Sequence, residues 1–221
     1  MTSNKILNFI FNLKKLNTPS SVEVLDPYIN KEAINIVNQF YNKFYSDNNK
    51  RTICFGINPG RFGGGITGIP FTDPFYLEEK CNIISSYKKK KEISASFIYE
   101  MIDSYGGVKK FYKKFYISSI CPYGFIENGK NFNYYDNKIL LRNWKKSIIK
   151  WIEIQLNNFG DSKQCVIIGK GKNQKFFELI NKEYKFFDEI IPLPHPRWIM
   201  QYKLKEKEKH INNYITTLKK I

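Results

Sequence analysis

Two polar residues stand where their side chains could do chemistry. Asn58 follows an apolar run, residues 53–57, and precedes a loop with five glycines between Gly60 and Gly68. His195 lies between two prolines, after a second apolar run near the C-terminus. Glycine allows positive φ and lets a ligand approach the backbone closely. A glycine-rich loop after a buried strand therefore predicts a binding rim at the strand's carboxyl end.

The glycine-rich loop does not match the common phosphate-binding motifs. A P-loop would end in Gly-Lys-Ser/Thr, whereas this loop continues as Gly-Ile-Thr-Gly-Ile-Pro-Phe. The dinucleotide fingerprint also fits poorly, because no clear helix with an acidic ribose partner on a following strand comes after it. The loop ends instead in Phe71, an aromatic residue held by Pro70.

Alternating strand and helix patterns must position these residues. They predict an α/β fold: a three-layer αβα sandwich with a central, mostly parallel four-stranded sheet, in a single domain over residues 1–221. Because ligands of such sheets bind at the carboxyl ends of the strands, the marked residues converge on one site. The expected strands are 53–57, 115–122, 164–169 and 187–193, and the expected helices are 5–16, 30–45, 92–104, 106–115, 134–159 and the segment from 203 onward.

The chain is strongly basic. It has 36 Lys and Arg against 20 Asp and Glu, a formal net charge of +16. A basic surface favours a polyanion, with nucleic acid first and an anionic membrane second, although an AT-rich genome also raises the Lys, Asn and Ile content. No segment is long and apolar enough to span a bilayer, so we expect a soluble, cytoplasmic, nucleoid-associated protein.

The four cysteines are far apart and form no Cys-x-x-Cys pair. Three of them lie in or beside apolar strand-like runs, which is typical of reduced, buried thiols in a cytoplasmic protein. We therefore expect no disulfide, no metal and no cofactor. The cysteines are Cys54, Cys81, Cys121 and Cys165.

Two motifs resemble the uracil-DNA glycosylase superfamily. The first is G-I-N-P-G-x-F-G-x-x-x-T-G-I-P-F, which spans residues 56–71 and is most similar to the single-strand-selective monofunctional (SMUG) branch. The second begins at Pro194-His195-Pro196, near the C-terminus as in the family, but Arg197-Trp198 replaces the usual serine and second proline. The absence of a four-cysteine cluster argues against the iron–sulfur branches. The pattern predicts a divergent, bacterial, SMUG-like side branch.

The resemblance implies a monofunctional DNA glycosylase that hydrolyses the N-glycosidic bond of uracil, and of 5-substituted uracils, to begin base excision repair. Asn58 would orient the attacking water, since an amide cannot act as a general base. His195 would donate an N–H to the departing base. Phe71 would stack on the base, and Gly60 would leave room at ring carbon 5.

The resemblance also indicates how DNA would be held. Ser119 stands where the family has an asparagine that reads the base edge, and serine cannot give the paired amide contacts. Arg197, Trp198 and Ile199 are candidates for the wedge that enters the minor groove. Lys170 and Lys172, after the third strand, suit DNA phosphates. The expected partner of the monomer is single- or double-stranded DNA that contains uracil.

Two other readings stay open. The chain could be a catalytically weak nucleic-acid-binding protein that keeps the glycosylase fold but has lost specificity with Ser119. It could also process free nucleotides or sugar phosphates through the glycine-rich rim.

Overall fold

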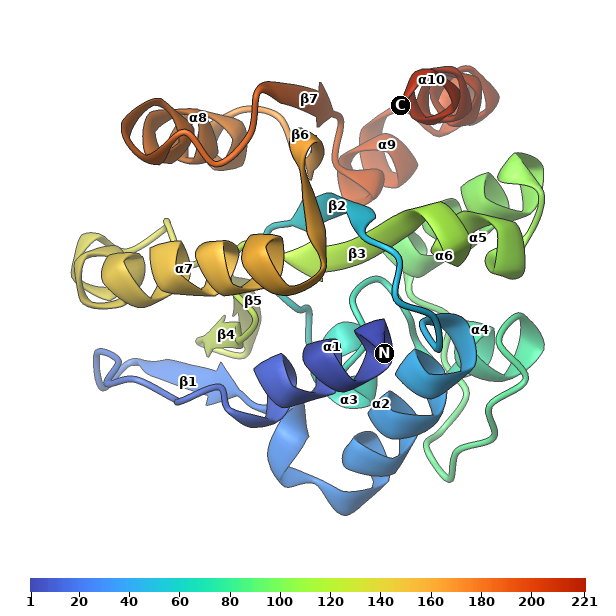
Figure 1. Cartoon of the computed structure of the whole chain (residues 1–221). Helices are drawn as coiled ribbons and strands as arrows, with labels where there is room; N and C mark the ends of the chain where they lie inside the picture. The colour runs from blue at the N-terminus through green and yellow to red at the C-terminus, as the bar shows by residue number, and fades with distance from the viewer.

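A central sheet of four parallel strands organises the computed structural model, which describes residues 1–221 (Figure 1). Its strand order is β3-β2-β6-β7. Every residue of β2 is buried, as expected for a parallel strand covered on both faces. The predicted α/β class and four-stranded sheet are confirmed. The strands are β2 (Arg51–Gly56), β3 (Phe115–Ser119), β6 (Gly160–Ile168) and β7 (Glu189–Leu193).

Helices form a layer on each face of the sheet (Figure 1). On one face, Cys54 and Val166 lie beside Met101, Phe111 and Tyr214. These three residues belong to α5 (Ile93–Tyr105), α6 (Val108–Lys114) and α10 (Lys207–Lys220). This face is therefore closed by apolar side chains from three helices.

The opposite face packs through aromatic rings. Phe55 of β2 lies 5.4 Å, between ring centroids, from Phe177 of α8 (Lys172–Tyr184). Tyr116 of β3 lies 4.9 Å from Phe159 of α7 (Lys138–Phe159). The first pair is tilted and the second is edge-on, and aromatic pairs of this kind stabilise a core beyond the area they bury. The three-layer sandwich predicted from the sequence is thus confirmed.

A second, antiparallel sheet, not predicted from the sequence, lies beside the main one. Its order is β1-β4-β5. The β4–β5 turn is formed by Asn128 and Gly129, which both have positive φ, as a two-residue hairpin turn requires. The strands are β1 (Val22–Leu25), β4 (Gly124–Glu127) and β5 (Lys130–Phe132). The remaining elements are α1 (Thr2–Phe11), η1 (Pro27–Ile29), α2 (Lys31–Phe44), α3 (Gly64–Thr67), α4 (Pro74–Glu79), α9 (Pro196–Tyr202) and η2 (Leu204–Glu206).

Several boundaries differ from the prediction for identifiable reasons. Strand β3 ends at Ser119 rather than residue 122, because the next two backbone N–H groups turn to donate to the carbonyls of Gly56 and Ile57. Helix α7 begins at residue 138 rather than 134, because the Asn137 side chain accepts from two backbone N–H groups and caps it there. Helix α1 covers residues 2–11 rather than 5–16.

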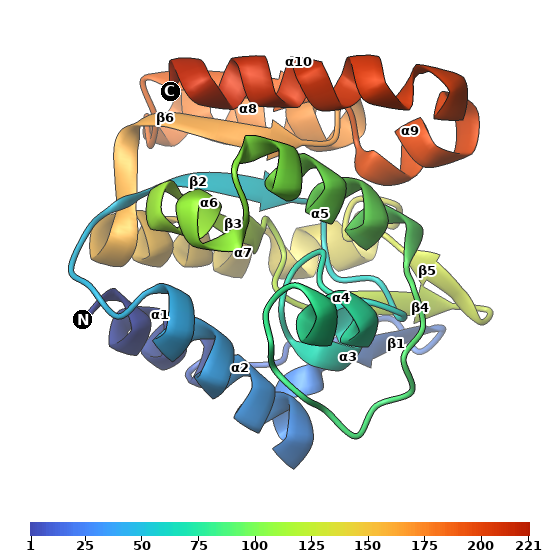
Figure 2. The ribbon, with the colours of Figure 1, turned by 90° about the vertical axis from the view of Figure 1, so that its right-hand side faces the viewer.

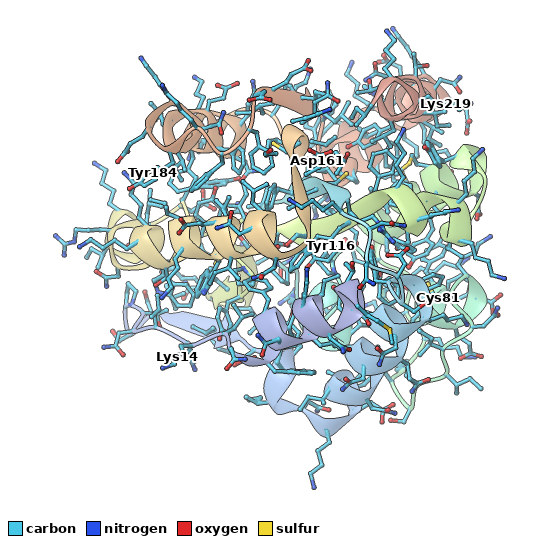
Figure 3. The ribbon with its side chains drawn as sticks, viewed as in Figure 1. Lys14, Cys81, Tyr116, Asp161, Tyr184 and Lys219 are labelled. Carbon is cyan, nitrogen blue, oxygen red and sulfur yellow. The ribbon has the colours of Figure 1, made fainter.

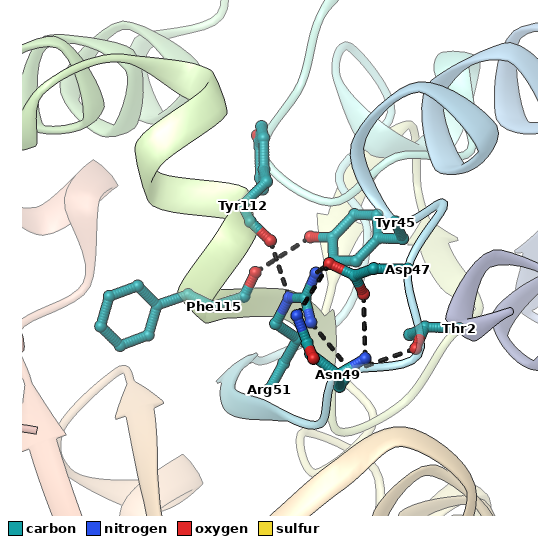
Figure 4. Close-up of polar contacts among 7 residues, drawn as sticks. All are labelled: Thr2, Tyr45, Asp47, Asn49, Arg51, Tyr112 and Phe115. Atoms are coloured by element: carbon teal, nitrogen blue, oxygen red, sulfur yellow. Dashed lines mark hydrogen bonds and ion pairs between the residues drawn. The ribbon is translucent and has the colours of Figure 1, made fainter.

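A buried arginine ties the start of β2 to its surroundings (Figure 4). The Arg51 side chain donates to the carbonyls of Tyr112 (2.9 Å) and Asn49 (2.8 Å) and pairs with Asp47 at 2.7 Å. The Thr2 hydroxyl donates to the same Asn49 carbonyl at 3.1 Å. This network anchors the N-terminus at the amino edge of the sheet.

The carboxyl ends of the strands lie at the opposite end of the molecule from both termini (Figure 2). Helix α9, helix α3 and the β4–β5 hairpin gather at that end. Lysines extend from the periphery, as Lys14 and Lys219 do in Figure 3, whereas Tyr116 lies in the interior.

No helix is long and apolar enough to cross a membrane.

Candidate active site

A cavity of about 310 Å³ opens at the carboxyl edge of the sheet. Segments that are far apart in sequence meet there: the loop after β2, the end of β3, strand β5, the start of α5, and α9. Most of the lining side chains are polar or small. The lining includes Asn58, Gly60, Gly63, Phe71, Glu92, Ser94, Ser119, Asn131, Asn133, His195, Arg197, Trp198, Gln201 and Tyr202.

Asn58 is held by the backbone that follows the β4–β5 hairpin. Its Oδ1 accepts from the Tyr134 N–H at 3.2 Å, and its Nδ2 donates to the Phe132 carbonyl at 3.2 Å. Nδ2 also donates to the Pro59 carbonyl at 3.4 Å, so both of its N–H groups have acceptors, whereas Oδ1 keeps one free lone pair. The amide is thus fixed in orientation, and its Oδ1 can still accept from a water molecule.

The Phe71 ring takes its place because Gly56 has no side chain. A Cβ on Gly56 would lie 2.8 Å from Cε2 of the ring. Phe71 itself has φ of +53°, an unusual backbone conformation for a bulky residue. The Thr67 hydroxyl donates to the Thr72 carbonyl at 2.7 Å and braces this turn. Residues of the first motif, together with Thr72, thereby hold the ring at the cavity wall.

His195 presents a defined nitrogen to the cavity. It is the N-cap of α9, and its Nδ1 accepts from the Arg197 N–H at 3.1 Å. A neutral imidazole that accepts at Nδ1 carries its proton on Nε2. Burial, with the Arg197 charge as the second cause, lowers the pKa of the imidazole to about 4. His195 is therefore a neutral Nε2–H donor near pH 7, and its ring centroid lies 5.7 Å from that of Phe71.

Ser119 points into the cavity from the end of β3. It is 5% exposed and pairs in register with Gly56 on β2. The preceding Ser118 points the other way and donates to Gln155 on α7, as alternation along a strand requires. The end of β3 therefore presents a single side-chain hydroxyl, that of Ser119, to the cavity.

The β4–β5 hairpin forms a wall of the cavity that sequence reasoning missed. The Asn131 Oδ1 accepts from the Arg61 N–H at 3.1 Å, and its Nδ2 lies 3.5 Å from where a Cβ on Gly60 would be. Arg61 also donates to the Gly129 carbonyl at the hairpin tip. Because Oδ1 is occupied by a donor, the Asn131 amide offers Nδ2 beside Gly60. The Asn-Gly dipeptide at the turn was the signal that could have located this hairpin.

Glu92 is a second lining residue that the sequence did not reveal. It caps α5, where its Oε2 accepts from the Ser94 and Ala95 N–H groups at 2.9 Å each. Its own N–H donates to the buried carboxylate of Asp73 at 2.6 Å. Glu92 contributes the one carboxylate of the lining. Neither its spacing nor its neighbours in the sequence mark it as a site residue.

The predicted wedge residues occupy different environments on α9. Arg197 and Trp198 line the cavity, and Trp198 is 43% exposed. Ile199 is 0% exposed and belongs to the core, so it does not reach the surface as the sequence reading expected. The reason is that residues 196–202 form a helix, whose turn carries Ile199 inward while Trp198 faces solvent.

Lys170 lies in the β6–α8 loop and Lys172 is the first residue of α8, and both are exposed and outside the cavity lining. Gly169 and Gly171, on either side of Lys170, have φ of +130° and +85°. The Lys172 ammonium is 3.8 Å from Asp136, too loosely paired to prevent contact with a phosphate. Both lysines start from the same sheet edge as the cavity.

No group of three or more His, Cys, Asp or Glu side chains is arranged to hold a metal ion. All four cysteines are free and buried, and burial raises the pKa of each thiol.

These features define a glycosylase-like α/β protein, and comparison with known proteins agrees. The model of the uracil DNA glycosylase superfamily matches residues 43–219, so the chain belongs to that superfamily. The crystal structure of wild-type Pedobacter heparinus SMUG2 is similar over 99% of this chain and 97% of that one, with 45% identity and a TM-score of 0.95. Among curated proteins, no relative matches.

The comparisons bear on the predictions from sequence. The predicted SMUG-like resemblance is confirmed, as is the predicted fold class. Superfamily membership supports a DNA glycosylase that acts in base excision repair, with DNA as its partner.

Proposed function

We propose that this protein is a monofunctional uracil-DNA glycosylase, which hydrolyses the N-glycosidic bond of uracil and of 5-substituted uracils in DNA to initiate base excision repair. The observation that carries the proposal is that His195 lines the cavity as a neutral N–H donor. Its Nδ1 is occupied by the Arg197 N–H, and its pKa of about 4 keeps the ring neutral, so Nε2–H is available as a donor in the cavity.

The target base has to leave the DNA stack before it can enter the cavity, because its glycosidic bond cannot be reached inside the duplex. The Phe71 ring provides an aromatic face for the extruded base. Ser119 and the Asn131 Nδ2 supply polar groups for its edge, and Gly60 leaves space beside ring carbon 5. The cavity thus offers stacking, edge recognition and room for a substituent.

Bond cleavage places the electron pair of the C1′–N1 bond on the departing base and leaves an oxocarbenium-like sugar. A donor aimed at the developing oxyanion stabilises this transition state, and His195 Nε2–H fills that role without giving up its proton. A water molecule oriented by Asn58 then adds to C1′, and its proton is lost to solvent while the base anion gains one from solvent. The products are the free base and an abasic site.

The monofunctional assignment follows from the lining. A glycosylase that also cleaves the strand needs an amine to form a Schiff base with the sugar. No lysine lines this cavity. Water is therefore the nucleophile that the residues support.

Basic side chains that could bind the DNA backbone lie at the same carboxyl edge of the sheet as the cavity. Arg197 and Trp198, which line the cavity, are the wedge candidates, and the exposed Lys170 and Lys172 are the candidates for DNA phosphates. The substrate is uracil-containing DNA, single- or double-stranded, bound by a monomer.

Base release from labelled oligonucleotides with one uracil tests the proposal, with alkaline cleavage of the abasic product as the readout. We expect release by the natural protein and a loss of about 100-fold or more in His195→Ala, the magnitude typical of removing one such donor. Tight DNA binding without release at any enzyme excess would favour the alternative, a catalytically weak nucleic-acid-binding protein.

A further inference from the structure

An aromatic ring stands exposed beside the cavity without a role in the chemistry above. Phe62 is 37% exposed, although large apolar side chains are usually covered. Its close neighbours in the chain, Gly60 and Gly63, both line the cavity. The ring therefore lies beside the cavity lining but not in it.

Two cations lie over the Phe62 ring. The guanidinium carbon of Arg61 is 4.5 Å and the Lys90 Nζ is 4.4 Å from the ring centroid. Lys91 next to it lies 4.2 Å over the Phe75 ring. The two lysines belong to the run 88–91, four consecutive lysines in the loop before α5.

Little negative charge compensates this cluster. Glu78 pairs with Lys89 at 2.6 Å, and the Glu92 carboxylate is occupied in capping α5. Lys90 and Lys91 contact rings instead of carboxylates. An exposed aromatic ring framed by unpaired cations is the combination that binds single-stranded nucleic acid, since rings stack on bases while cations hold phosphates.

We propose that the nucleotide next to the target base stacks on Phe62 when it is unpaired, while Arg61, Lys90 and Lys91 hold the neighbouring phosphates. This deepens, and rests on, the proposed action on DNA. In the free protein the Lys90 ammonium covers the ring, and it moves to a phosphate as the base takes its place. The exchange is favourable because base–aromatic stacking stabilises more than an exposed cation–π contact.

The platform favours unpaired strands. In a duplex both faces of a base are covered by its stacked neighbours and its edge is paired, so the base cannot turn onto Phe62 without losing those interactions. In a single strand the base is free to do so. The contribution of Phe62 is therefore large for single-stranded DNA and small for a fully paired duplex.

The test combines a protein change with a DNA change. Single-turnover uracil release is measured on a single-stranded oligonucleotide and on two copies in which the nucleotide on the 5′ or the 3′ side of the uracil is an alkali-stable tetrahydrofuran abasic analogue. For the natural protein, loss of the base on one side is expected to lower the rate constant at subsaturating enzyme by about tenfold. Phe62→Ala should lose about tenfold on the intact strand and nothing further on that abasic strand.

The controls separate stacking from folding. Phe62→Trp should keep full activity, because indole also stacks. Lys182→Ala, an exposed lysine at the far end of α8, should behave as the natural protein, whereas Lys90→Ala with Lys91→Ala should weaken binding and reduce its salt dependence. Thermal melting of each variant checks that the fold is intact.

Two results would overturn the platform. The first is that the loss from Phe62→Ala and the loss from the missing base multiply when they are combined. The second is that Phe62→Trp is as poor as Phe62→Ala. Equilibrium binding of the same strands with 2′-fluorodeoxyuridine at the target, which resists cleavage, repeats the comparison without turnover. If the natural protein releases no uracil while binding still depends on Phe62 and on the neighbouring base, the glycosylase proposal fails and the platform stands.

Discussion

The backbone N–H of Arg197 donates to Nδ1 of His195 across 3.1 Å, and this one bond decides which nitrogen of the imidazole carries the proton. It forms because His195 is the N-cap of α9 and Pro196 begins the helix. Proline is favoured at the first helical position, since its fixed φ suits the helix and its missing N–H is not needed there. The second motif thus sets the tautomer of the residue that it contains.

The pH dependence of turnover follows from the His195 pKa of about 4. Above that pH the ring is neutral and donates through Nε2, and below it the ring is charged. We expect no inflection in kcat from His195 near pH 6.5, where an ordinary histidine titrates, and a fall only on approach to pH 4. A pH profile of single-turnover rates checks this, and a midpoint near 6.5 that disappears in His195→Gln would contradict it.

His195 should also make the free energy of unfolding depend on pH, in the opposite direction to a histidine that gains a salt bridge on folding. The unfolded chain binds a proton near pH 6.5 that the folded chain does not bind until about pH 4. The free energy of unfolding therefore falls as the pH drops through that window, and above it His195 contributes no pH dependence. His195→Gln should remove this part of the slope in urea unfolding at pH 4.5 and 7.5. An unchanged slope would show that the folded ring titrates normally.

Gly56→Ala tests whether the ring of Phe71 is placed by the missing side chain. The new Cβ would lie 2.8 Å from the ring, so the ring has to move. We expect kcat/KM for uracil to fall about tenfold, with a stability loss of about 1–3 kcal/mol. The change should have little effect on kcat/KM in a Phe71→Leu background, since coupled residues are not additive. Equal losses in both backgrounds would mean that Gly56 acts elsewhere.

Gly60→Ala is predicted to change the base range while the fold remains intact. A Cβ there meets only the Asn131 Nδ2, at an ordinary 3.5 Å, so the free protein tolerates it. The methyl group occupies the space assigned to a substituent on ring carbon 5. Release of uracil should persist, while release of 5-hydroxymethyluracil falls roughly ten- to hundredfold. Competition between the two bases in one reaction measures the ratio, and an unchanged ratio would remove Gly60 from the recognition of that substituent.

The site residues that the sequence predicts are those whose position in the cavity is set by the local conformation of the chain. Asn58 and Phe71 follow β2 and His195 follows β7, each within a contiguous motif, so their position at the sheet edge depends on short-range structure. Asn131 reaches the cavity only because the hairpin docks on the Arg61 N–H. Glu92 does so because α5 begins there. Such approaches depend on tertiary packing, which a single sequence does not display.

Ile199 is a residue that the sequence assigned to the site and that the structure places in the core. The sequence makes Arg197, Trp198 and Ile199 alike candidates for the wedge. The His-Pro pair just before them is an N-cap followed by a first-turn proline, which indicates a helix. In a helix adjacent residues face about 100° apart, so Trp198 and Ile199 cannot share one surface. The helix therefore leaves Arg197 and Trp198 as wedge candidates.

Arg51→Met tests the network that anchors the amino edge of the sheet, far from the cavity. The substitution leaves the carbonyls of Tyr112 and Asn49 without the guanidinium that now donates to them at 2.9 and 2.8 Å. The Asn49 carbonyl keeps the Thr2 hydroxyl as a donor, whereas the Tyr112 carbonyl is left unpaired and the ion pair with Asp47 is lost. A buried acceptor left unpaired costs about 1–3 kcal/mol, although Met fills much of the volume. We expect the free energy of unfolding to fall by about 2–4 kcal/mol and Tm by roughly 5–10 °C.

Arg142→Met is the matched control for this change, because Arg142 is exposed on α7 and should alter unfolding by less than about 0.5 kcal/mol. Uracil release by Arg51→Met, measured well below its Tm, should equal that of the natural protein, since none of the network residues lines the cavity. A loss of turnover without a loss of stability would mean that the amino edge is coupled to the site. The stability loss with full turnover would confine Arg51 to holding the start of β2 and the N-terminus together.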